Sequence, residues 1–188
     1  MTQHASQQAS LAFPDFTIAS APPAARRTMT ATEKHLGYLP AAMARMAGSP
    51  HLLDGFMKLT AIFDGSTLSP LARETLVMTI AARNGCHLCL AMHTARLTAL
   101  GADPSLIASL RRAEPLVDPA LETVRVFTLH VLDTTGDADD EALRAFLAAG
   151  YTSQNALEVV LGIGTYTMST FANRLTRAPI DDQLSAFA

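Results

Sequence analysis

Charged side chains are scarce in this sequence, and lysine is the scarcest of them. Charged residues make up 16% of the 188 residues, and Lys34 and Lys58 are the only lysines. The 14 Lys and Arg residues stand against 17 Asp and Glu residues, which gives a net charge of −3. A chain without a basic surplus has little with which to neutralise phosphates, so we expect no nucleic-acid partner.

Long apolar runs are also missing. The uncharged stretch at residues 159–173 is interrupted by Thr, Ser and Asn, and it falls short of the roughly 20 apolar residues that span a bilayer. Residues 1–13 contain no Lys or Arg and are rich in Gln, Ser and Thr, unlike a signal peptide. We therefore expect no membrane association and a cytoplasmic location.

Cysteine is rare as well, because the sequence holds only Cys86 and Cys89. A secreted fold stabilised by disulfides needs more cysteines, spread along the chain. A bond between these two would close a very short loop and contribute little to stability. Their C-x-x-C spacing is better explained by chemistry.

Strand signals are scarce, and helix signals recur along the chain. No hairpin dipeptide lies between alternating apolar runs. Ser or Asp followed by Pro, as at Ser49-Pro50 and Asp118-Pro119, is typical of helix N-termini. These signals predict an all-α domain with helices at 32–36 and 41–47, from 50 to Gly65, from 70 to Asn84, at 86–101, from 104, from 119, at 142–149, and from 152 to about 175.

The first residues differ in composition from the rest. Pro14, Pro22 and Pro23 interrupt a segment dominated by Ala, Ser, Thr and Gln. This composition predicts an extended N-terminal arm over residues 1–28, which we expect to pack on a neighbouring subunit. The helical domain is expected at residues 29–188.

The residues with the clearest chemical meaning are Cys86, Cys89 and His93. On a helix they share one face, with His93 one turn beyond Cys89. Helix N-terminal amides and a nearby imidazolium both favour a thiolate over a thiol. A second thiol three residues away can then condense with a sulfenic acid to give a disulfide. The spacing therefore indicates a thiol peroxidase or disulfide reductase.

Two other interpretations of the cysteine pair are open. Cys86, Cys89 and His93 could bind zinc, with His87 or water as the fourth ligand. Structural zinc usually draws ligands from two separated segments, and no second segment is visible, so we expect no metal and no cofactor. The cysteines could also be buried and inert.

The spacing of Glu74, Gly162 and Gly164 is less distinctive than that of the cysteines and His93. Spacing alone favours an exposed Glu74, paired with Arg73 or Arg83. Gly162 and Gly164 do not form a dinucleotide-binding motif, because no strand precedes them, and they are expected to allow close helix packing.

Taken together, the motif resembles that of the carboxymuconolactone decarboxylase / alkylhydroperoxidase D-like (AhpD-like) family. Glu74, the Asn-Gly pair, the C-x-x-C pair and the later histidine match in type and spacing, and the resemblance extends over about 27–179. The stretches at 36–40, 65–70 and 171–175 are also similar to that family.

The resemblance implies an all-helical homo-oligomer, as a dimer, trimer or hexamer. It implies that Cys89 attacks a hydroperoxide and that Cys86 resolves the product as a disulfide. His93 would take the thiol proton, and Glu74 would orient His93. A thiol/disulfide reductant protein or a small thiol would then reduce the disulfide.

One position departs from the peroxidase pattern, which has a histidine immediately before the second cysteine. Leu88 stands there, and His87 stands one place earlier. Residues 87 and 89 point about 200° apart on a helix, so His87 is not a simple substitute. Proton handling at Cys86 is expected to be weaker or to follow another route.

The leading functional hypothesis is a thiol-dependent hydroperoxide reductase. One alternative is a decarboxylase-type enzyme in which Glu74 and His93 act as acid and base on a carboxylated lactone. The other is a non-enzymatic oligomer whose cysteine pair acts as a redox switch.

Overall fold

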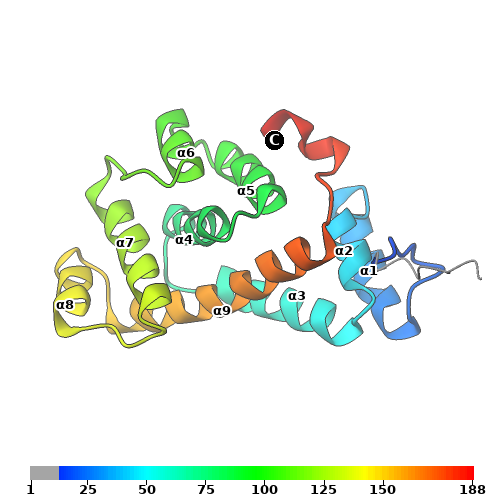
Figure 1. Ribbon diagram of the computed structural model, residues 1–188, viewed down its shortest axis with the longest axis horizontal. Coiled ribbons are helices and arrows are strands. Elements are labelled where there is room, and N and C mark those ends of the chain that lie inside the picture. The colour runs from blue at the N-terminus through cyan, green and yellow to red at the C-terminus, as the bar shows by residue number, and fades with distance from the viewer. Residues whose placement is uncertain (1–12) are drawn as a thin grey trace, which may run out of the picture.

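The computed structural model describes residues 13–188, and this part of the chain is helical with no β-strand. Figure 1 shows the order of the elements along the chain. They are α1 (Pro23–Leu36), α2 (Ala41–Met46), α3 (Pro50–Asp64), α4 (Pro70–Arg83), α5 (His87–Ala99), α6 (Pro104–Arg111), α7 (Pro119–Asp133), α8 (Asp140–Ala148), α9 (Ser153–Thr176) and the short 3-10 helix η1 (Asp182–Phe187). The predicted all-α fold class is confirmed.

The predicted helix starts have the local chemistry that defines them. The side chains of Ser49, Ser69, Asp103 and Asp118 each accept a backbone N–H from the first turn of the following helix, and a proline follows each of them. Each such cap stabilises its helix by about 1 kcal/mol. These four helices therefore begin where the sequence predicts.

The first helix is the main departure from the predicted elements. A short helix at 32–36 was expected, but α1 begins at Pro23 and buries Ala25, Met29 and Thr32. Proline is favoured at the first position of a helix, and Pro23 starts α1 instead of interrupting the chain. Helix therefore begins inside the predicted arm. Residues 1–12 lie outside the described part, and the packing of the arm on a neighbour stays a prediction.

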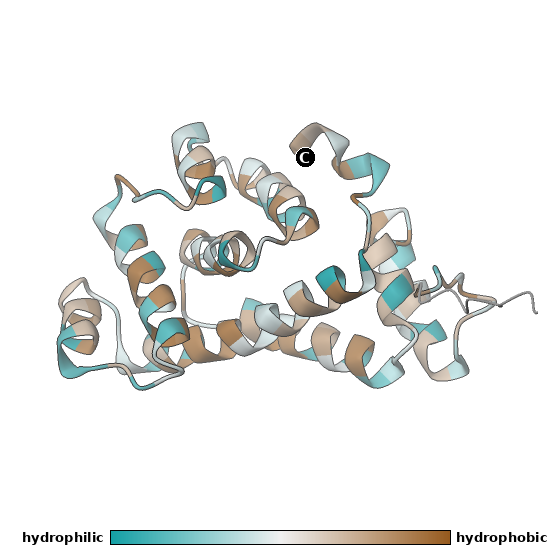
Figure 2. Ribbon diagram, in the orientation of Figure 1, coloured by the Kyte–Doolittle hydropathy of each residue, from teal (hydrophilic) through white to brown (hydrophobic). Residues whose placement is uncertain are grey.

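Helix α4 is the centre of the domain and contacts α5, α7 and α9 (Figure 1). Every residue from Glu74 to Ala81 is buried, so α4 is enclosed on all sides. The apolar residues that surround it appear brown in Figure 2. Any polar side chain in the middle of α4 is therefore buried and must find a polar partner.

Long α9 passes close to α4 at one glycine. A Cβ atom at Gly162 would lie 2.7 Å from side-chain atoms of both Leu76 and Phe63. A Cβ at Gly164 would meet no atom within 4 Å. The prediction that these glycines allow close helix packing is thus confirmed for Gly162 and wrong for Gly164.

The C-terminal segment returns to α5, which the sequence analysis did not anticipate. Leu184 of η1 joins an apolar cluster with Cys86, Leu88 and Cys89. Arg111 donates to the carbonyl of Phe187 at 2.7 Å. Among residues 13–188, no helix has the length and apolarity needed to cross a membrane.

Candidate functional site

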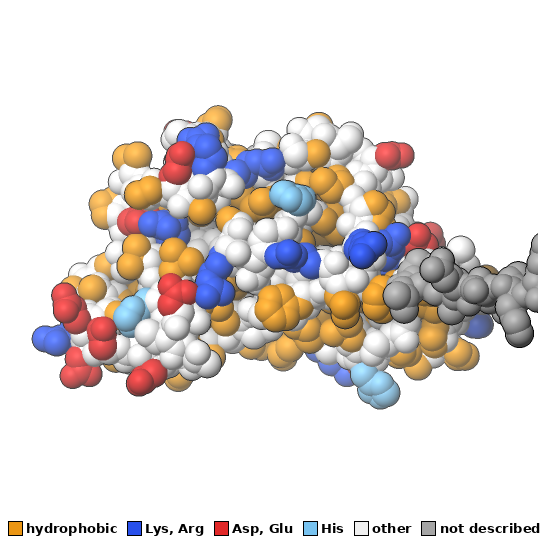
Figure 3. Space-filling view, viewed as in Figure 1, with side chains coloured by type: hydrophobic (Ala, Val, Ile, Leu, Met, Phe, Trp, Pro, Cys, Tyr) orange, Lys and Arg blue, Asp and Glu red, His pale blue; other side chains and the backbone are white. Residues whose placement is uncertain are grey.

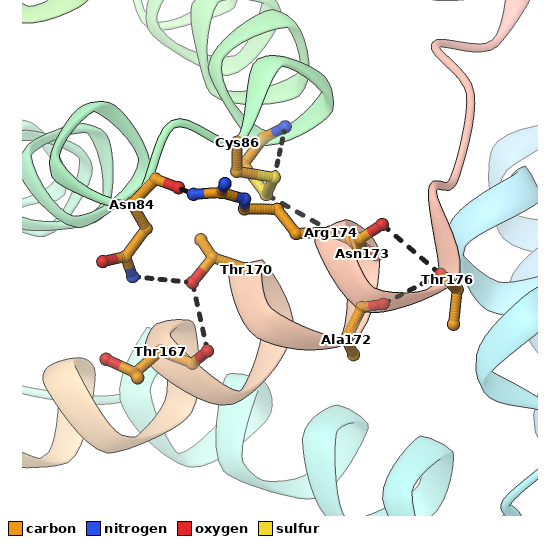
Figure 4. The surroundings of a disulfide bond; sticks show 9 residues. Asn84, Cys86, Thr167, Thr170, Ala172, Asn173, Arg174 and Thr176 are labelled. Carbon is orange, nitrogen blue, oxygen red and sulfur yellow. Dashed lines mark hydrogen bonds between the residues drawn. A yellow bond between two sulfur atoms is a disulfide. The ribbon is translucent and has the colours of Figure 1, made fainter.

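The two cysteines lie at the N-terminus of α5, directly after a sharp turn from α4. Gly85 has a φ of +62°, a conformation that glycine adopts readily, and it turns the chain between the two helices. Cys86 is the N-cap residue of α5, and its sulfur accepts the backbone N–H of Cys89 at 3.3 Å. The two sulfurs form a disulfide, with their Cα atoms 5.3 Å apart (Figure 4).

A side chain from α9 touches the disulfide. The amide nitrogen of Asn173 donates to the sulfur of Cys89 at 3.4 Å (Figure 4). Asn173 is 5% exposed, and its Oδ1 atom has no hydrogen-bond partner among residues 13–188. The sequence analysis missed Asn173 as a site residue. The only available signal was its place in the family-like stretch at 171–175.

Glu74 and His93 form a buried pair one turn along α5 from the sulfurs. A carboxylate oxygen of Glu74 lies 2.6 Å from Nδ1 of His93, and each residue is 4% exposed. The other carboxylate oxygen lies 3.2 Å from Nε of Arg96. Burial alone would raise the pKa of Glu74, but the neighbouring His93 and Arg96 hold that pKa below its ordinary value.

The ionised Glu74 carboxylate can only accept hydrogen bonds, so Nδ1 of His93 carries the proton between them. Nε2 is then the nitrogen of the neutral ring that can take up a proton. This is the geometry of a histidine base oriented by a carboxylate.

The structure corrects the expectation that spacing gave for Glu74. An exposed glutamate paired with Arg73 or Arg83 was predicted, and this was wrong. Arg83 pairs with Asp133 at 2.8 Å, and Arg73 donates to the carbonyl of Leu68. The family resemblance placed Glu74 beside His93, and the structure does bring these two side chains together. Arg96, the second partner of Glu74, was missed.

Cys86 and His93 line different cavities, and Cys89 lines neither of them. Cys86 lines a cavity of about 350 Å³ beside the start of α5. His93 lines another of about 720 Å³. Within the described part of the chain, no hydrogen bond joins His93 to either sulfur. Cys86 and His93 are therefore close along the chain but border separate cavities.

The surface of the larger cavity is mostly apolar, as in small-molecule sites, although polar and charged side chains also line it. Tyr166 is one of those groups, and its ring meets His93 edge-on with centroids 5.5 Å apart. Burial raises the pKa of Tyr166 to about 12, although Arg96 opposes the shift, so the phenol is neutral at pH 7. Its apolar lining residues are Ala31, Leu36, Pro40, Met43, Phe56, Met57, Met92, Ala95 and Leu184.

The departure from the family pattern has a clear structural consequence. Leu88 is buried in the apolar cluster around the disulfide, whereas His87 is exposed and lines the smaller cavity together with Cys86. A histidine is therefore present on the Cys86 side of the site, although not at the family position.

Metal coordination was the alternative interpretation of the cysteine pair. Over residues 13–188, no group of three or more His, Cys, Asp or Glu side chains is arranged to hold a metal ion. His93 directs Nδ1 at Glu74, and the two sulfurs are bonded to one another. No residue set in this part of the chain is assigned to a metal.

Comparison with protein families agrees with the resemblance found in the sequence. The model of the carboxymuconolactone decarboxylase family matches residues 50–128. This segment contains Glu74, both cysteines and His93. Over these residues the match agrees with the family that the sequence resembles. No curated protein matches the chain at a significant level.

Solved structures with the same fold cover nearly the whole chain. An alkylhydroperoxidase AhpD core, an uncharacterized peroxidase-related protein from Ralstonia eutropha JMP134, has a TM-score of 0.82 at 18% identity, over 92% of this chain and 93% of that one. A peroxidase-related protein from Silicibacter sp. TM1040 has a TM-score of 0.77 at 20% identity, with coverage of 92% and 93%. The debrominase Bmp8, as a variant in complex with 2,3,4-tribromopyrrole, has a TM-score of 0.75 at 16% identity, with coverage of 93% and 94%. At these identities the likeness shows the fold and not the reaction.

Proposed function

Because residues 50–128 match the carboxymuconolactone decarboxylase family and the whole chain has the fold of AhpD-core proteins, we propose that this protein is a thiol-dependent reductase of organic hydroperoxides. The observation that carries the proposal is the bonded Cys86–Cys89 pair, one helical turn from an imidazole that a buried carboxylate holds. The match and the fold support an enzyme of a peroxidase-related or decarboxylase type, and the cysteine pair favours the first.

The proposed reaction has two steps in the reduced protein. The Cys89 thiolate attacks the terminal oxygen of ROOH and the O–O bond breaks. The alkoxide takes the proton that His93 removed from the Cys89 thiol, so the products are a Cys89 sulfenic acid and the alcohol ROH. The Cys86 thiol then attacks the sulfenic sulfur, and water leaves as the disulfide forms. His93 takes the thiol proton of Cys89, Glu74 orients His93, and Asn173 donates a hydrogen bond to the sulfur that becomes charged.

The larger cavity supports an organic rather than an inorganic peroxide. Its volume of about 720 Å³ far exceeds the size of hydrogen peroxide, and Phe56, Met57 and Met92 make its walls apolar. Burying an apolar group in such a cavity contributes about 25 cal/mol per Å² of surface. We therefore expect cumene hydroperoxide to react faster than hydrogen peroxide.

The test is a single-turnover experiment with reduced protein. Cumene hydroperoxide is added, and mass spectrometry follows the Cys86–Cys89 disulfide and the loss of peroxide. Cys86→Ser should stop at a sulfenic acid on Cys89, and Cys89→Ser should consume no peroxide. If the wild-type protein forms no disulfide in response to peroxide, the proposal fails.

A second candidate function has its own supporting observation. His93, which Glu74 holds, lines the larger cavity, and neither cysteine does. Arg27 and Arg96 line the same cavity and can pair with a carboxylate. This arrangement suits acid–base chemistry on a carboxylated lactone, as in the decarboxylase branch. A Cys86→Ser/Cys89→Ser double variant separates the two functions. Retained turnover of such a lactone would favour this candidate over the peroxidase.

The remaining expectations about partners and assembly stay predictions. Helix α9 exposes Leu157, Phe171 and Leu175, which are 72%, 59% and 70% exposed, and a homo-oligomer would cover such apolar side chains. Light scattering on the purified protein measures the number of subunits. Repeating it with and without a reductant tests the redox-switch alternative, which requires that the assembly state change.

A further inference from the structure

The smaller cavity, beside Cys86, differs in chemistry from the larger one. It is lined by exposed His87, Arg174 and Arg177, and none of the residues lining it is acidic. Figure 3 shows Lys and Arg side chains across the middle of this face, whereas acidic side chains gather toward α8. A basic cavity on a chain with a net charge of −3 is a local feature and does not follow from the overall composition.

The protein holds one of the two arginines of this cavity in place, and it neutralises neither of them. Arg174 donates to the carbonyl of Asn84, and its guanidinium lies against Gly85, the residue before Cys86 (Figure 4). Arg177 follows the end of α9, where Gly85, Cys86 and Arg174 line the same cavity. Neither arginine forms an ion pair with an acidic side chain of residues 13–188. Both guanidinium groups therefore keep their charge available for an anion.

Two further groups of the cavity point to a ligand. Asn173 lines it, is 5% exposed, and has an Oδ1 atom without a partner in the described residues. A buried acceptor of this kind usually has a hydrogen-bond donor, and none of the described residues supplies one. The first turn of α5 also lines the cavity, and the N-terminus of a helix attracts negative charge.

We propose that the basic cavity binds the reductant of the disulfide, and that this reductant is a small thiol bearing one or more carboxylates. The proposal rests on the proposed function, which requires an external thiol. A volume of about 350 Å³ lies at the lower end of the range for small-molecule sites, which fits a short peptide thiol held inside the cavity. A protein reductant would need an exposed sulfur, and both sulfurs here are buried.

The reaction at this site is a pair of thiol–disulfide exchanges. A thiolate RS⁻ attacks the sulfur of Cys86, the S–S bond breaks, and Cys89 leaves as a thiolate that Asn173 stabilises. A second RS⁻ attacks the mixed disulfide, which releases RSSR and the thiolate of Cys86. Two protons taken from solvent return both cysteines to thiols. Two thiols are thus oxidised to one disulfide, and the protein disulfide is reduced.

The test measures reduction of the oxidised protein without any peroxide, so its outcome is independent of the peroxidase proposal. The probes are 3-mercaptopropionate, 2-mercaptoethanol and cysteamine, which are anionic, neutral and cationic. Rate constants are compared per thiolate, after correction for the pKa of each probe. We expect the anionic thiol to react about tenfold faster than the neutral one at low salt, an effect of the size that electrostatic steering produces. The cationic thiol should be the slowest, and added salt should remove the differences.

Variants assign the preference to this cavity. Arg177→Gln should abolish most of the preference for the anionic thiol. Arg177→Lys should retain that preference because the charge is kept. Arg144→Gln, on distant α8, removes the same charge and should leave the preference intact. Arg174→Gln is less clean because Arg174 also holds the turn at Asn84, so thermal unfolding must show that it folds. Equal rates for the three thiols, or an unchanged preference in Arg177→Gln, would overturn the proposal.

Discussion

Glutamine in place of Glu74 keeps the shape of the side chain and removes the charge that holds His93. The lost interaction is the 2.6 Å contact to Nδ1, together with the 3.2 Å contact to Arg96. A hydrogen bond to a charged group contributes about 1.5–3 kcal/mol. The Arg96 contact should add little, because the Arg96 side chain is 44% exposed and also reaches Asp64 at 3.5 Å. We therefore expect Glu74→Gln to lower the free energy of unfolding by about 2 kcal/mol.

The effect of Glu74→Gln on activity should be larger than its effect on stability. A positioned general base contributes about 10²–10⁴ in rate. Glutamine can still hold the ring of His93, although in either tautomer. We therefore expect the rate to fall by roughly 100-fold, near the lower end of that range. The assay is single-turnover disulfide formation with cumene hydroperoxide, alongside thermal unfolding. Glu141→Gln on exposed α8 is the matched control and should change neither quantity appreciably.

The pH profile of the rate separates a positioning role from a merely structural one. Glu74→Gln should change the dependence of the rate on pH, because a carboxylate no longer fixes the tautomer of His93. A uniformly slower enzyme with an unchanged profile would indicate only loss of folded protein. Wild-type rate and wild-type stability in Glu74→Gln would refute the role assigned to this pair.

Three other predictions follow from single contacts. Gly162→Ala should destabilise the protein by about 1–3 kcal/mol, because its Cβ would overlap Leu76 and Phe63; Gly164→Ala, which meets nothing, should be neutral or stabilising when both are compared by chemical denaturation. Asn173→Ala should lower the thiolate fraction of Cys89 at pH 7 and slow disulfide formation about fivefold, the value of one hydrogen bond of ~1 kcal/mol; thiolate absorbance in the ultraviolet and the single-turnover rate measure these, and an unchanged thiolate titration would contradict the contact. The pKa of Glu74 is lower in the folded protein than the ordinary value of 4.5, so its stabilising effect should be complete above pH 4.5 and be lost as the pH falls through the folded pKa; unfolding measured from pH 6 to 3 should show a shallower loss in Glu74→Gln than in the wild type.

Helix positions could be predicted because their signals are local. The hydroxyl of Ser69 accepts the N–H of Ala72, three residues away, and Asp118 caps α7 in the same way. Such contacts form within one turn and do not depend on the rest of the fold. The error at α1 has the same origin, because Pro23 can either interrupt a chain or begin a helix, and the burial of Met29 decides between them.

The site could be predicted only in part, because its partners come from distant parts of the chain. Glu74 lies 19 residues from His93, and Asn173 lies 84 residues from Cys89. Periodicity identifies one apolar face of a helix, but α4 is enclosed on every side, so an acidic residue that looked exposed is buried. The cysteine pair and His93 lie on one helix, and their spacing was therefore informative.

The division of the site between two cavities makes a kinetic prediction that a single crevice would not. A hydroperoxide in the apolar cavity at His93 and a thiol in the basic cavity at Cys86 would occupy separate cavities along α5. In a ping-pong cycle that uses one shared site, each substrate at high concentration blocks the form of the enzyme that the other must bind. With separate sites this mutual inhibition is absent. Steady-state rates measured with 3-mercaptopropionate and cumene hydroperoxide, both varied to well above their KM values, should therefore give parallel double-reciprocal lines without substrate inhibition. Competitive inhibition by either substrate at high concentration would show that the two cavities do not serve as separate binding sites, even if the cysteine chemistry is as proposed.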